Sequence, residues 1–417
     1  MRRRAFLASG GATFVSASTA GCLGWLLPSG DDPVERWTYE FSPGQVAGPV
    51  AVGGYAYLGV EDRLVGLELE SGAVETELPA TVGALAPAPE TLLVADEAEG
   101  ELLAVSPGEE SPRWRAPMRS FPPPTDEERV YLSGPETVSA RELETGAVEW
   151  ERPVSEAPWG LFEHVGDLVI GAGDADDRAG DADDGAGDAD DGAGDPAEGA
   201  DQGTDQEWVA VDADEGEIVW RTPRAGRGRT PVLADGGLVF AGNETDQAPT
   251  AVQGLASDDG TEGWTYEIEN TVAEPVAAVG ETVVVSGRGR HVETTAALVA
   301  ETGAERWRRQ DRLATVHDGI VYTIRGRMAY GIGADVATPQ WSSPVEFVDD
   351  DGTPRADATV IGDGLVVGAD GEFVSFHLDH GTERWTYSAD RPPAHWGGLD
   401  DALYHVGDGT LVVLDVD

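Results

Sequence analysis

Closely spaced aspartates are the residues of this 417-residue sequence whose spacing most clearly suggests chemistry. Residues 174–205 form an acidic insertion built on a seven-residue repeat of DADD, then Arg or Gly, then Ala-Gly. Carboxylate oxygens separated by glycines suit Ca²⁺. The insertion lacks the regularly spaced large apolar residue that a calcium-binding β-roll packs inward. We therefore expect a solvated acidic loop, with calcium binding as the open alternative.

Histidines are the second group, because imidazoles bind transition metals. The chain has seven, scattered over its length. His377 and His380 are near neighbours, and His395 and His405 belong to the last repeat, so either pair is a candidate metal site. Histidines with such spacing are more often turn or rim residues. We predict no resident metal and no catalytic residue.

The N-terminal segment is typical of an exported protein. A twin-arginine pattern is followed by a short, mildly apolar run that is too short to span a bilayer. We predict a signal peptide over residues 1–21. The residues that carry the export signal are Arg3, Arg4, Phe6 and Leu7.

Cys22, the single cysteine, ends the run Thr-Ala-Gly-Cys and resembles the lipidated cysteine of a lipobox. An incidental thiol is the alternative. A lipid on Cys22, with residues 22–33 as a tether, would hold the protein at the outer face of the cytoplasmic membrane after twin-arginine export. A lone cysteine excludes an internal disulfide.

The charge balance is extreme, with 27 basic against 78 acidic residues and a net charge of −51. All 27 basic residues are Arg. Repulsion on this scale is tolerable at molar salt, where the Debye length falls to about 3 Å. The composition is typical of extreme halophiles, most of all haloarchaea. It argues against a nucleic-acid partner, because phosphate binding needs clustered Lys and Arg.

A seven-residue stretch with a glycine and, four residues later, a tryptophan recurs along the chain, as in ETGAERW at 301–307 and ETGAVEW at 144–150. Short runs of alternating apolar and polar residues with Gly and Asp turns precede each stretch, and no helical period is visible. Each unit predicts a four-stranded antiparallel sheet. The tryptophans recur roughly every 40 residues, which is the length of a propeller blade.

Within each unit, the glycine is expected at the hairpin between the third and fourth strands, where a positive φ is needed. The tryptophan is expected to pack against the next blade, with its indole N–H bonded to a carbonyl. Thr76 replaces the tryptophan in the first unit and Ala337 replaces the glycine in the seventh. The predicted docking tryptophans are Trp37, Trp114, Trp150, Trp220, Trp264, Trp307, Trp341 and Trp385. The predicted turn glycines are Gly146, Gly216, Gly260, Gly303 and Gly381.

The ends of the chain complete one unit between them. After Trp385 come three strand-like runs without a fourth, whereas residues 34–41 read as a fourth strand alone. We expect the N- and C-terminal strands to pair and so close the propeller, which removes an exposed sheet edge. Counting this composite unit gives nine.

ALVAETGAERW at 297–307 resembles the tryptophan-docking repeat of the pyrroloquinoline-quinone-type propeller family, as do SARELETGAVEW at 139–150 and WVAVDADEGEIVW at 208–220. The resemblance covers almost all of residues 34–417 and implies an all-β fold. It also implies eight blades, so we expect eight, with nine open if the weak unit near residues 77–114 is a true blade.

The family resemblance implies two functions. One branch comprises quinone-dependent dehydrogenases that bind the quinone and Ca²⁺ over the central channel. The other comprises lipoproteins, such as the propeller subunit of the bacterial outer-membrane assembly machine, that bind proteins and catalyse nothing. We expect a monomeric, non-catalytic interaction scaffold for protein partners at the cell surface, without cofactor. A quinone-dependent dehydrogenase and a solute- or glycan-binding lipoprotein are the alternatives.

Overall fold

The structure is a computed structural model. It describes residues 32–153, 160–174, 206–223, 231–234, 237–242, 250–268, 271–289, 293–346 and 356–416. The predicted export residues, the predicted lipidation site and most of the acidic insertion lie outside the described residues: Arg3, Arg4, Phe6, Leu7, Cys22 and 175–205.

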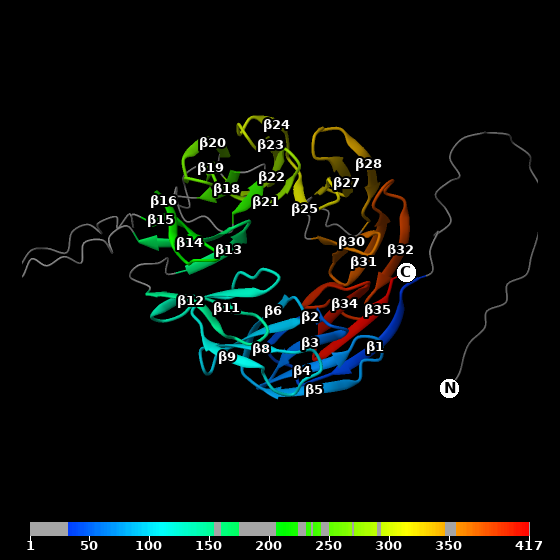
Figure 1. Ribbon diagram of the computed structural model, residues 1–417. Coiled ribbons are helices and arrows are strands. Elements are labelled where there is room, and N and C mark those ends of the chain that lie inside the picture. Colours follow the sequence, from blue (N-terminus) through cyan, green and yellow to red (C-terminus); the bar gives the residue numbers. More distant parts are fainter. Residues whose placement is uncertain are drawn as a thin grey trace, which may run out of the picture.

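All regular elements of the described residues are β-strands, and they form nine antiparallel sheets. Figure 1 shows these sheets arranged around a common centre, with the first strand of most sheets near the centre and the fourth at the periphery. This arrangement is a β-propeller, as the sequence predicts. No helix in the described part of the chain is long and apolar enough to cross a membrane.

We number the blades in chain order. Blade 1 consists of β2 (Val46–Val52), β3 (Tyr55–Val60), β4 (Arg63–Glu68) and β5 (Val74–Pro79). Blade 2 consists of β6 (Val82–Ala88), β7 (Thr91–Asp96), β8 (Glu101–Val105) and β9 (Trp114–Pro117). Blade 3 consists of β10 (Arg129–Ser133), β11 (Thr137–Glu142) and β12 (Val148–Pro153). Blade 4 consists of β13 (Gly160–Val165), β14 (Leu168–Asp174), β15 (Gln206–Asp212) and β16 (Ile218–Pro223).

The second half of the chain repeats the pattern. Blade 5 consists of β17 (Val232–Ala234), β18 (Gly237–Gly242), β19 (Thr250–Ala256) and β20 (Glu262–Ile268). Blade 6 consists of β21 (Thr271–Val279), β22 (Thr282–Gly289), β23 (Glu293–Val299) and β24 (Glu305–Arg309). Blade 7 consists of β25 (Arg312–His317), β26 (Ile320–Arg325), β27 (Met328–Gly333) and β28 (Pro339–Pro344). Blade 8 consists of β29 (Asp357–Ile361), β30 (Gly364–Ala369), β31 (Glu372–His377) and β32 (Glu383–Ser388).

Blade 9 is built from both ends of the chain. It consists of β33 (His395–Leu399), β34 (Ala402–Gly407), β35 (Thr410–Asp415) and β1 (Val34–Glu40). The N-terminal β1 pairs antiparallel with the C-terminal β35, from Val34 opposite Asp415 to Glu40 opposite Thr410. The pairing of terminal strands that the sequence predicts is present.

The described residues form nine blades, so the expectation of eight is wrong and the alternative of nine, left open by the weak unit near residues 77–114, is confirmed. The weak unit is blade 2, a complete four-stranded sheet. Its third and fourth strands are joined by the eight-residue segment 106–113 in place of the short glycine turn of the other blades. The repeat pattern therefore fades there, although the strand pairing is regular.

The prediction of four strands fails for blade 3, which has three. Where its first strand would lie, Thr125 makes one isolated bridge to Val130. The preceding residues Pro122, Pro123 and Pro124 have no backbone N–H to donate to a strand neighbour. The proline run therefore prevents an inner strand from forming.

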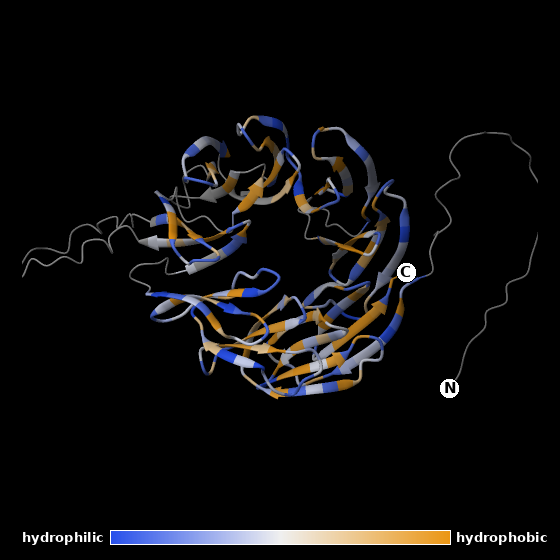
Figure 2. Cartoon of the chain, in the orientation of Figure 1, coloured by the Kyte–Doolittle hydropathy of each residue, from blue (hydrophilic) through white to orange (hydrophobic). Residues whose placement is uncertain are grey.

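The hydrophobic core lies between the blades. Nine buried clusters occur in the described residues, and each draws its residues from two neighbouring blades. Figure 2 shows hydrophobic residues along the strands and hydrophilic residues at the turns. Because no cluster belongs to one blade alone, a single blade cannot bury its own apolar faces.

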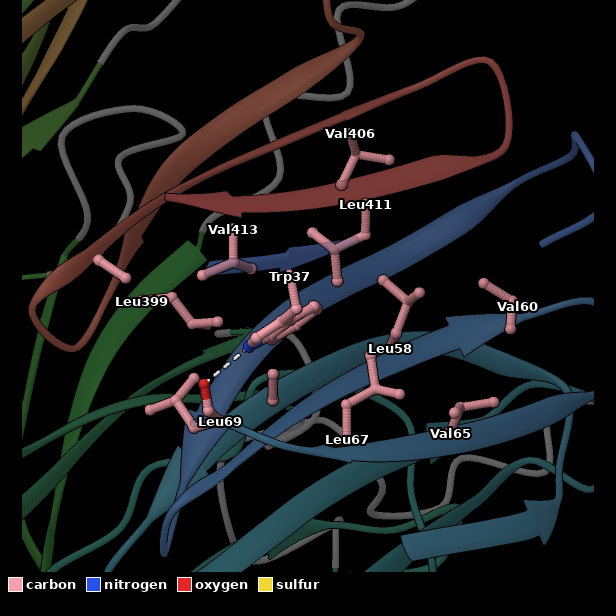
Figure 3. Packing of buried hydrophobic residues seen from close by; sticks show 12 residues of the cluster. Trp37, Leu58, Val60, Val65, Leu67, Leu69, Leu399, Val406, Leu411 and Val413 are labelled. Atoms are coloured by element: carbon pink, nitrogen blue, oxygen red, sulfur yellow. Dashed lines mark hydrogen bonds between the residues drawn. The ribbon is translucent and has the colours of Figure 1, made fainter. Parts of the chain in front are cut away.

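Every docking tryptophan donates its indole N–H to a backbone carbonyl of the following blade. The bond from Trp37 to Leu69 is 2.8 Å and crosses from blade 9 to blade 1 (Figure 3). The other seven bonds are 2.8 to 3.3 Å long. They run from Trp114 to Leu143, Trp150 to Ala213, Trp220 to Ser257, Trp264 to Ala300, Trp307 to Ala334, Trp341 to Leu378 and Trp385 to Val416.

Each turn glycine lies directly against one of these indole rings, and we call it the seat of that tryptophan. Gly303 has a φ of +65°, and a Cβ there would lie 2.4 Å from Cε3 of Trp264, so no other residue fits without displacing the ring. The acceptor carbonyl precedes the seat glycine by three residues, as Ala300 precedes Gly303. The tryptophan and glycine pairs are Trp37 on Gly72, Trp114 on Gly146, Trp150 on Gly216, Trp220 on Gly260, Trp264 on Gly303 and Trp341 on Gly381.

Each indole also needs room within its own blade. The residue paired with the tryptophan on the third strand is small in blades 2 to 8, for example Ala140 opposite Trp150 and Gly331 opposite Trp341. A Cβ at Gly331 would lie 2.4 Å from Nε1 of Trp341. This explains the small residue that the repeat carries ten positions before its tryptophan.

Blade 1 docks on blade 2 without a tryptophan. Thr76 occupies the tryptophan position and is fully buried. Tyr57, on β3, supplies the missing contact, because its hydroxyl accepts a 2.8 Å hydrogen bond from the backbone N–H of Gly108 in blade 2. Ala337, which replaces the turn glycine in blade 7, changes the docking less, since Trp307 still donates to the carbonyl of Ala334 at 2.8 Å.

Comparing Gly→Ala variants at two glycines distinguishes the cost of displacing an indole from the cost of a positive φ. Gly303 lies under Trp264, whereas Gly280 has a similar φ of +55° and no atom within 4 Å of the place where a Cβ would lie. We expect Gly280→Ala to cost about 1–2 kcal/mol of unfolding free energy for the left-handed backbone. Gly303→Ala should cost about 1–3 kcal/mol more, because the methyl group displaces the indole. Denaturant unfolding checks this, and equal costs for the two variants would refute the seat.

Candidate functional site: the acidic turn face

The turns that join first to second strands and third to fourth strands lie on one face of the propeller, because neighbouring strands are antiparallel. We call this the turn face. Hydrogen bonds connect its two sets of turns, as from the N–H of Leu69 to the carbonyl of Gly54 at 2.9 Å. Outside the 106–113 segment of blade 2, the described turns on this face contain no Arg.

Carboxylates crowd the turn face instead. In the described first-to-second turns, and in the corresponding loop before β10 of blade 3, they are Glu90, Asp126, Glu127, Glu128, Asp167, Glu281, Asp318, Asp363, Asp400 and Asp401. In the described third-to-fourth turns they are Glu70, Glu109, Glu110, Glu144, Asp214, Glu215, Glu217, Asp258, Asp259, Glu301, Asp335 and Asp379. The face therefore presents a strong negative potential to anything that approaches it.

Among the grooves between blades in the described part of this face, two are rich in carboxylates. Groove 1 lies between blades 9 and 1 and has a volume of about 940 Å³. Its lining includes one arginine, Arg36, and five carboxylates: Glu68, Glu70, Asp400, Asp401 and Asp415. Arg36 forms ion pairs with two of them, Asp415 at 2.5 Å and Asp401 at 3.2 Å. The groove keeps a net negative charge.

Groove 2 lies between blades 2 and 3 and has a volume of about 750 Å³. Arg113 is its one basic lining residue. The carboxylates that line it are Glu90, Glu127, Glu128, Glu142, Glu144 and Glu149. Both grooves lie beside a tryptophan-accepting residue, Leu69 in groove 1 and Leu143 in groove 2. They are thus equivalent places in the repeat.

Arginines that directly precede a docking tryptophan form ion pairs with carboxylates of the turn face. Arg306 contacts Glu281 of its own blade at 3.5 Å and Asp335 of the next blade at 3.4 Å. Arg384 contacts Asp363 at 2.6 Å. These partly exposed pairs neutralise some turn carboxylates and leave the rest of the face acidic.

Asp126 forms the most connected polar site of this face. Its carboxylate accepts hydrogen bonds from the Tyr131 hydroxyl at 2.7 Å and from the backbone N–H groups of Glu128 and Arg129 at 2.8 and 2.6 Å. Burial alone would raise the pKa of Asp126, but these bonds outweigh it and hold the pKa below its usual value. Burial and the bond to Asp126 raise the pKa of Tyr131, which stays protonated as the donor.

His164 does not turn this site into a catalytic arrangement. Its ring stacks on Tyr131 with centroids 5.4 Å apart, and its Nε2 lies 3.9 Å from Asp126, beyond hydrogen-bonding distance. Arg129 contacts Asp126 through its Nε at 3.0 Å and also reaches blade 4, where it donates to Asp214 at 2.6 Å and to the carbonyl of Ala213 at 2.9 Å. The site joins blades 3 and 4.

The two histidine pairs that the sequence suggests as metal sites differ in the structure: one pair is in contact and the other is not. His377 and His380 lie on the turn face with ring centroids 4.7 Å apart. His395 and His405 are not gathered into a ligand cluster. His405 lies 3.2 Å from the Tyr387 hydroxyl, and burial lowers its pKa. Sequence reasoning misses Tyr57 and Tyr131, because their bonds depend on residues of other strands and loops.

The described part of the first strands holds no group of three His or acidic residues that could bind a metal ion such as Ca²⁺. The first strands lie nearest the centre, and two of them, VAGPVAV of β2 and VGALAPA of β6, consist of apolar residues, whereas β13, β29 and β33 each carry acidic or His residues. Ca²⁺ takes six to eight oxygen ligands. In the described part of the chain, the group of His and acidic residues close enough to hold a metal ion is on the turn face, not on these strands.

Comparison with known proteins agrees with the repeat and the fold. Residues 205–416 match the family model described as outer membrane protein assembly factor BamB. The chain belongs to this PQQ-type β-propeller family. None of the curated proteins matches the sequence.

Solved structures resemble the chain at low identity. A eukaryotic initiation factor structure is 10% identical with a TM-score of 0.56, over 87% of this chain and 91% of that chain. BamB from Moraxella catarrhalis is 14% identical with a TM-score of 0.47, over 93% and 98%. Quinohemoprotein alcohol dehydrogenase from Comamonas testosteroni is 11% identical with a TM-score of 0.49, over 92% and 76%. Such identities show the propeller fold alone.

Asp126→Asn tests the polar site through pH. Because the folded pKa of Asp126 is lowered, its stabilising effect is present above the unfolded pKa of about 3.9 and is lost as pH falls through the folded value. We expect the difference in unfolding free energy between wild type and Asp126→Asn to be largest near pH 7 and to shrink below about pH 4. Urea unfolding across this range measures it. The matched control, Asp258→Asn in an exposed turn, should differ less from wild type at pH 7, and a pH-independent difference for Asp126→Asn would contradict the assignment.

Proposed function

We propose that this protein is a membrane-anchored, extracytoplasmic β-propeller lipoprotein that acts as a non-catalytic scaffold for protein partners. The observation that carries the proposal is the match of residues 205–416 to the family described as an outer membrane protein assembly factor. A rigid propeller with interblade cores suits such a role, because it can present one face without rearranging. We propose that the propeller works as a monomer.

The acidic turn face supports a choice of partner. Groove 1 and groove 2 are lined by five and six carboxylates, each with one arginine. Such a lining favours a segment rich in Lys or Arg and disfavours acidic segments. At high salt the Debye length is only a few ångströms, about 3 Å at 1 M, so the partner's cations must enter the grooves to gain from them.

The location rests on the N-terminal segment. Export through Arg3 and Arg4 and a lipid on Cys22 would place the propeller at the outer face of the cytoplasmic membrane. The net charge of −51 supports a halophilic, haloarchaeal source. Such a cell has no outer membrane, so outer-membrane assembly itself is not part of the proposal.

Charge reversal in groove 1 tests the scaffold role. Glu70→Lys with Asp400→Lys places two cations in the groove, and both side chains are exposed. The matched control is Glu75→Lys with Glu267→Lys, which makes the same charge change on exposed outer strands. In crosslinking and pull-down from native membranes, we expect the groove variant to lose partner proteins that wild type and the control retain. Identical captured proteins from all three chains would argue against the groove.

Cys22→Ser tests the anchor. Without the thiol no lipid can be attached, so the protein should appear in the medium or remain as an unprocessed precursor. Cell fractionation followed by immunoblotting measures the shift. Unchanged membrane attachment of the variant would show that Cys22 is not the anchor, and it would leave the scaffold role to be judged by the groove variant.

A further inference from the structure

Two histidines and an aspartate meet on the third-to-fourth turn of blade 8. The ligand atoms of His377, Asp379 and His380 all lie within 4.8 Å of one another. The two imidazole centroids are 4.7 Å apart, and Nε2 of His380 is 3.4 Å from Oδ1 of Asp379. Asp379 and His380 are exposed and His377 is half-buried, so an ion can reach them from solvent.

The repeat explains why these side chains meet. His377 and His380 stand four residues and one residue before the seat glycine Gly381. In blades 1 and 3 the same two positions hold Glu and Ser or Thr, and their side chains are hydrogen-bonded at 2.5 Å, as between Ser71 and Glu68. The turn thus brings these positions into contact whatever their residues. In blade 8 it brings two imidazoles together.

Docking also fixes the backbone of this turn. Trp341 donates to the carbonyl of Leu378 at 2.8 Å, and Ser343 donates to the carbonyl of Gly381. Within the turn, the N–H of Gly381 donates to the carbonyl of His377 at 2.9 Å. The ligand positions are therefore held from the blade 7 side before any ion binds, which lowers the entropic cost of binding.

A neighbouring hydroxyl orients one of the rings. Oγ1 of Thr382 lies 2.9 Å from Nδ1 of His380. The backbone N–H of Thr382 lies 3.4 Å from the same Nδ1 and donates to it when that nitrogen is unprotonated. Metal binding through Nε2 requires the other tautomer, in which Nδ1 carries the proton and donates to the hydroxyl oxygen. A ligating histidine whose other nitrogen is hydrogen-bonded is the usual arrangement at metal sites.

We propose that His377, Asp379 and His380 bind a divalent transition-metal ion of the Zn²⁺ class on the turn face. Imidazole favours Zn²⁺, Ni²⁺ and Cu²⁺, whereas Mg²⁺ and Ca²⁺ prefer oxygen ligands, so the two rings set this turn apart from the other acidic turns. Three protein ligands leave a coordination position of Zn²⁺ for water or for a side chain of a bound protein.

Zinc titration of the full chain in excess Mg²⁺ tests this proposal, because Mg²⁺ occupies the many surface carboxylates. We expect one saturable Zn²⁺ site per chain by calorimetry and a rise in melting temperature with Zn²⁺. His377→Gln and His380→Gln should each weaken this site at least about tenfold. Co²⁺ substituted for Zn²⁺ should give a visible absorption band that both variants lose.

His317→Gln is the matched control. His317 is a half-buried histidine on the same face, with its Nε2 3.4 Å from Asp318, and it thus offers one imidazole and one carboxylate without a second ring. This variant should bind Zn²⁺ like wild type. Equal Zn²⁺ binding by wild type and His380→Gln, or no saturable binding above the carboxylate background, would overturn the site.

Discussion

The seat of each tryptophan on the next blade is the contact on which the rest of this structure depends. Each docking indole donates to a carbonyl of the next blade. In most blades a glycine follows that carbonyl by three positions, and a small residue lies opposite the indole on its own third strand. Ala337 at the glycine position in blade 7 and Val413 opposite Trp37 are exceptions. These contacts fix the spacing of the repeat. They constrain the buried side of each turn and leave its exposed side free for carboxylates, or, in blade 8, for imidazoles.

Much of the fold is readable from the sequence because each hairpin carries parts of two successive contacts: the glycine that receives the tryptophan of the preceding blade, and the tryptophan that docks on the following blade. Glycine and tryptophan lie four residues apart on one hairpin, so the pattern survives in a linear reading. Blade 2 does not show the pattern, because the long segment 106–113 replaces the short hairpin. Blade 3 lacks the expected inner strand, because Pro122, Pro123 and Pro124 interrupt it. The substitute contact of Tyr57 with Gly108 joins residues of different blades, which no periodicity reveals.

The turn face is less predictable, because its features form between elements. Groove 1 combines residues from both ends of the chain, such as Glu70 and Asp401. The Asp126 site depends on Arg129 reaching blade 4. His377 and His380 are visible as neighbours in the sequence, but only the geometry of the turn places their rings in contact. Spacing identifies candidates here, and the hairpin conformation decides which of them meet.

Blade 9 has a consequence for the order of folding. Its outer strand holds Val34 and its next strand holds Asp415, so the pair joins residues from the first and last tenths of the chain. Contacts of such large sequence separation form late, because the loop-closure entropy must be overcome before they contribute. During synthesis, β1 has no partner strand and Trp37 has no finished sheet around it until β35 has been made. A chain stalled before β35 would therefore expose this strand to other chains, and the lifetime of that exposed state would be set by how fast synthesis reaches residue 415.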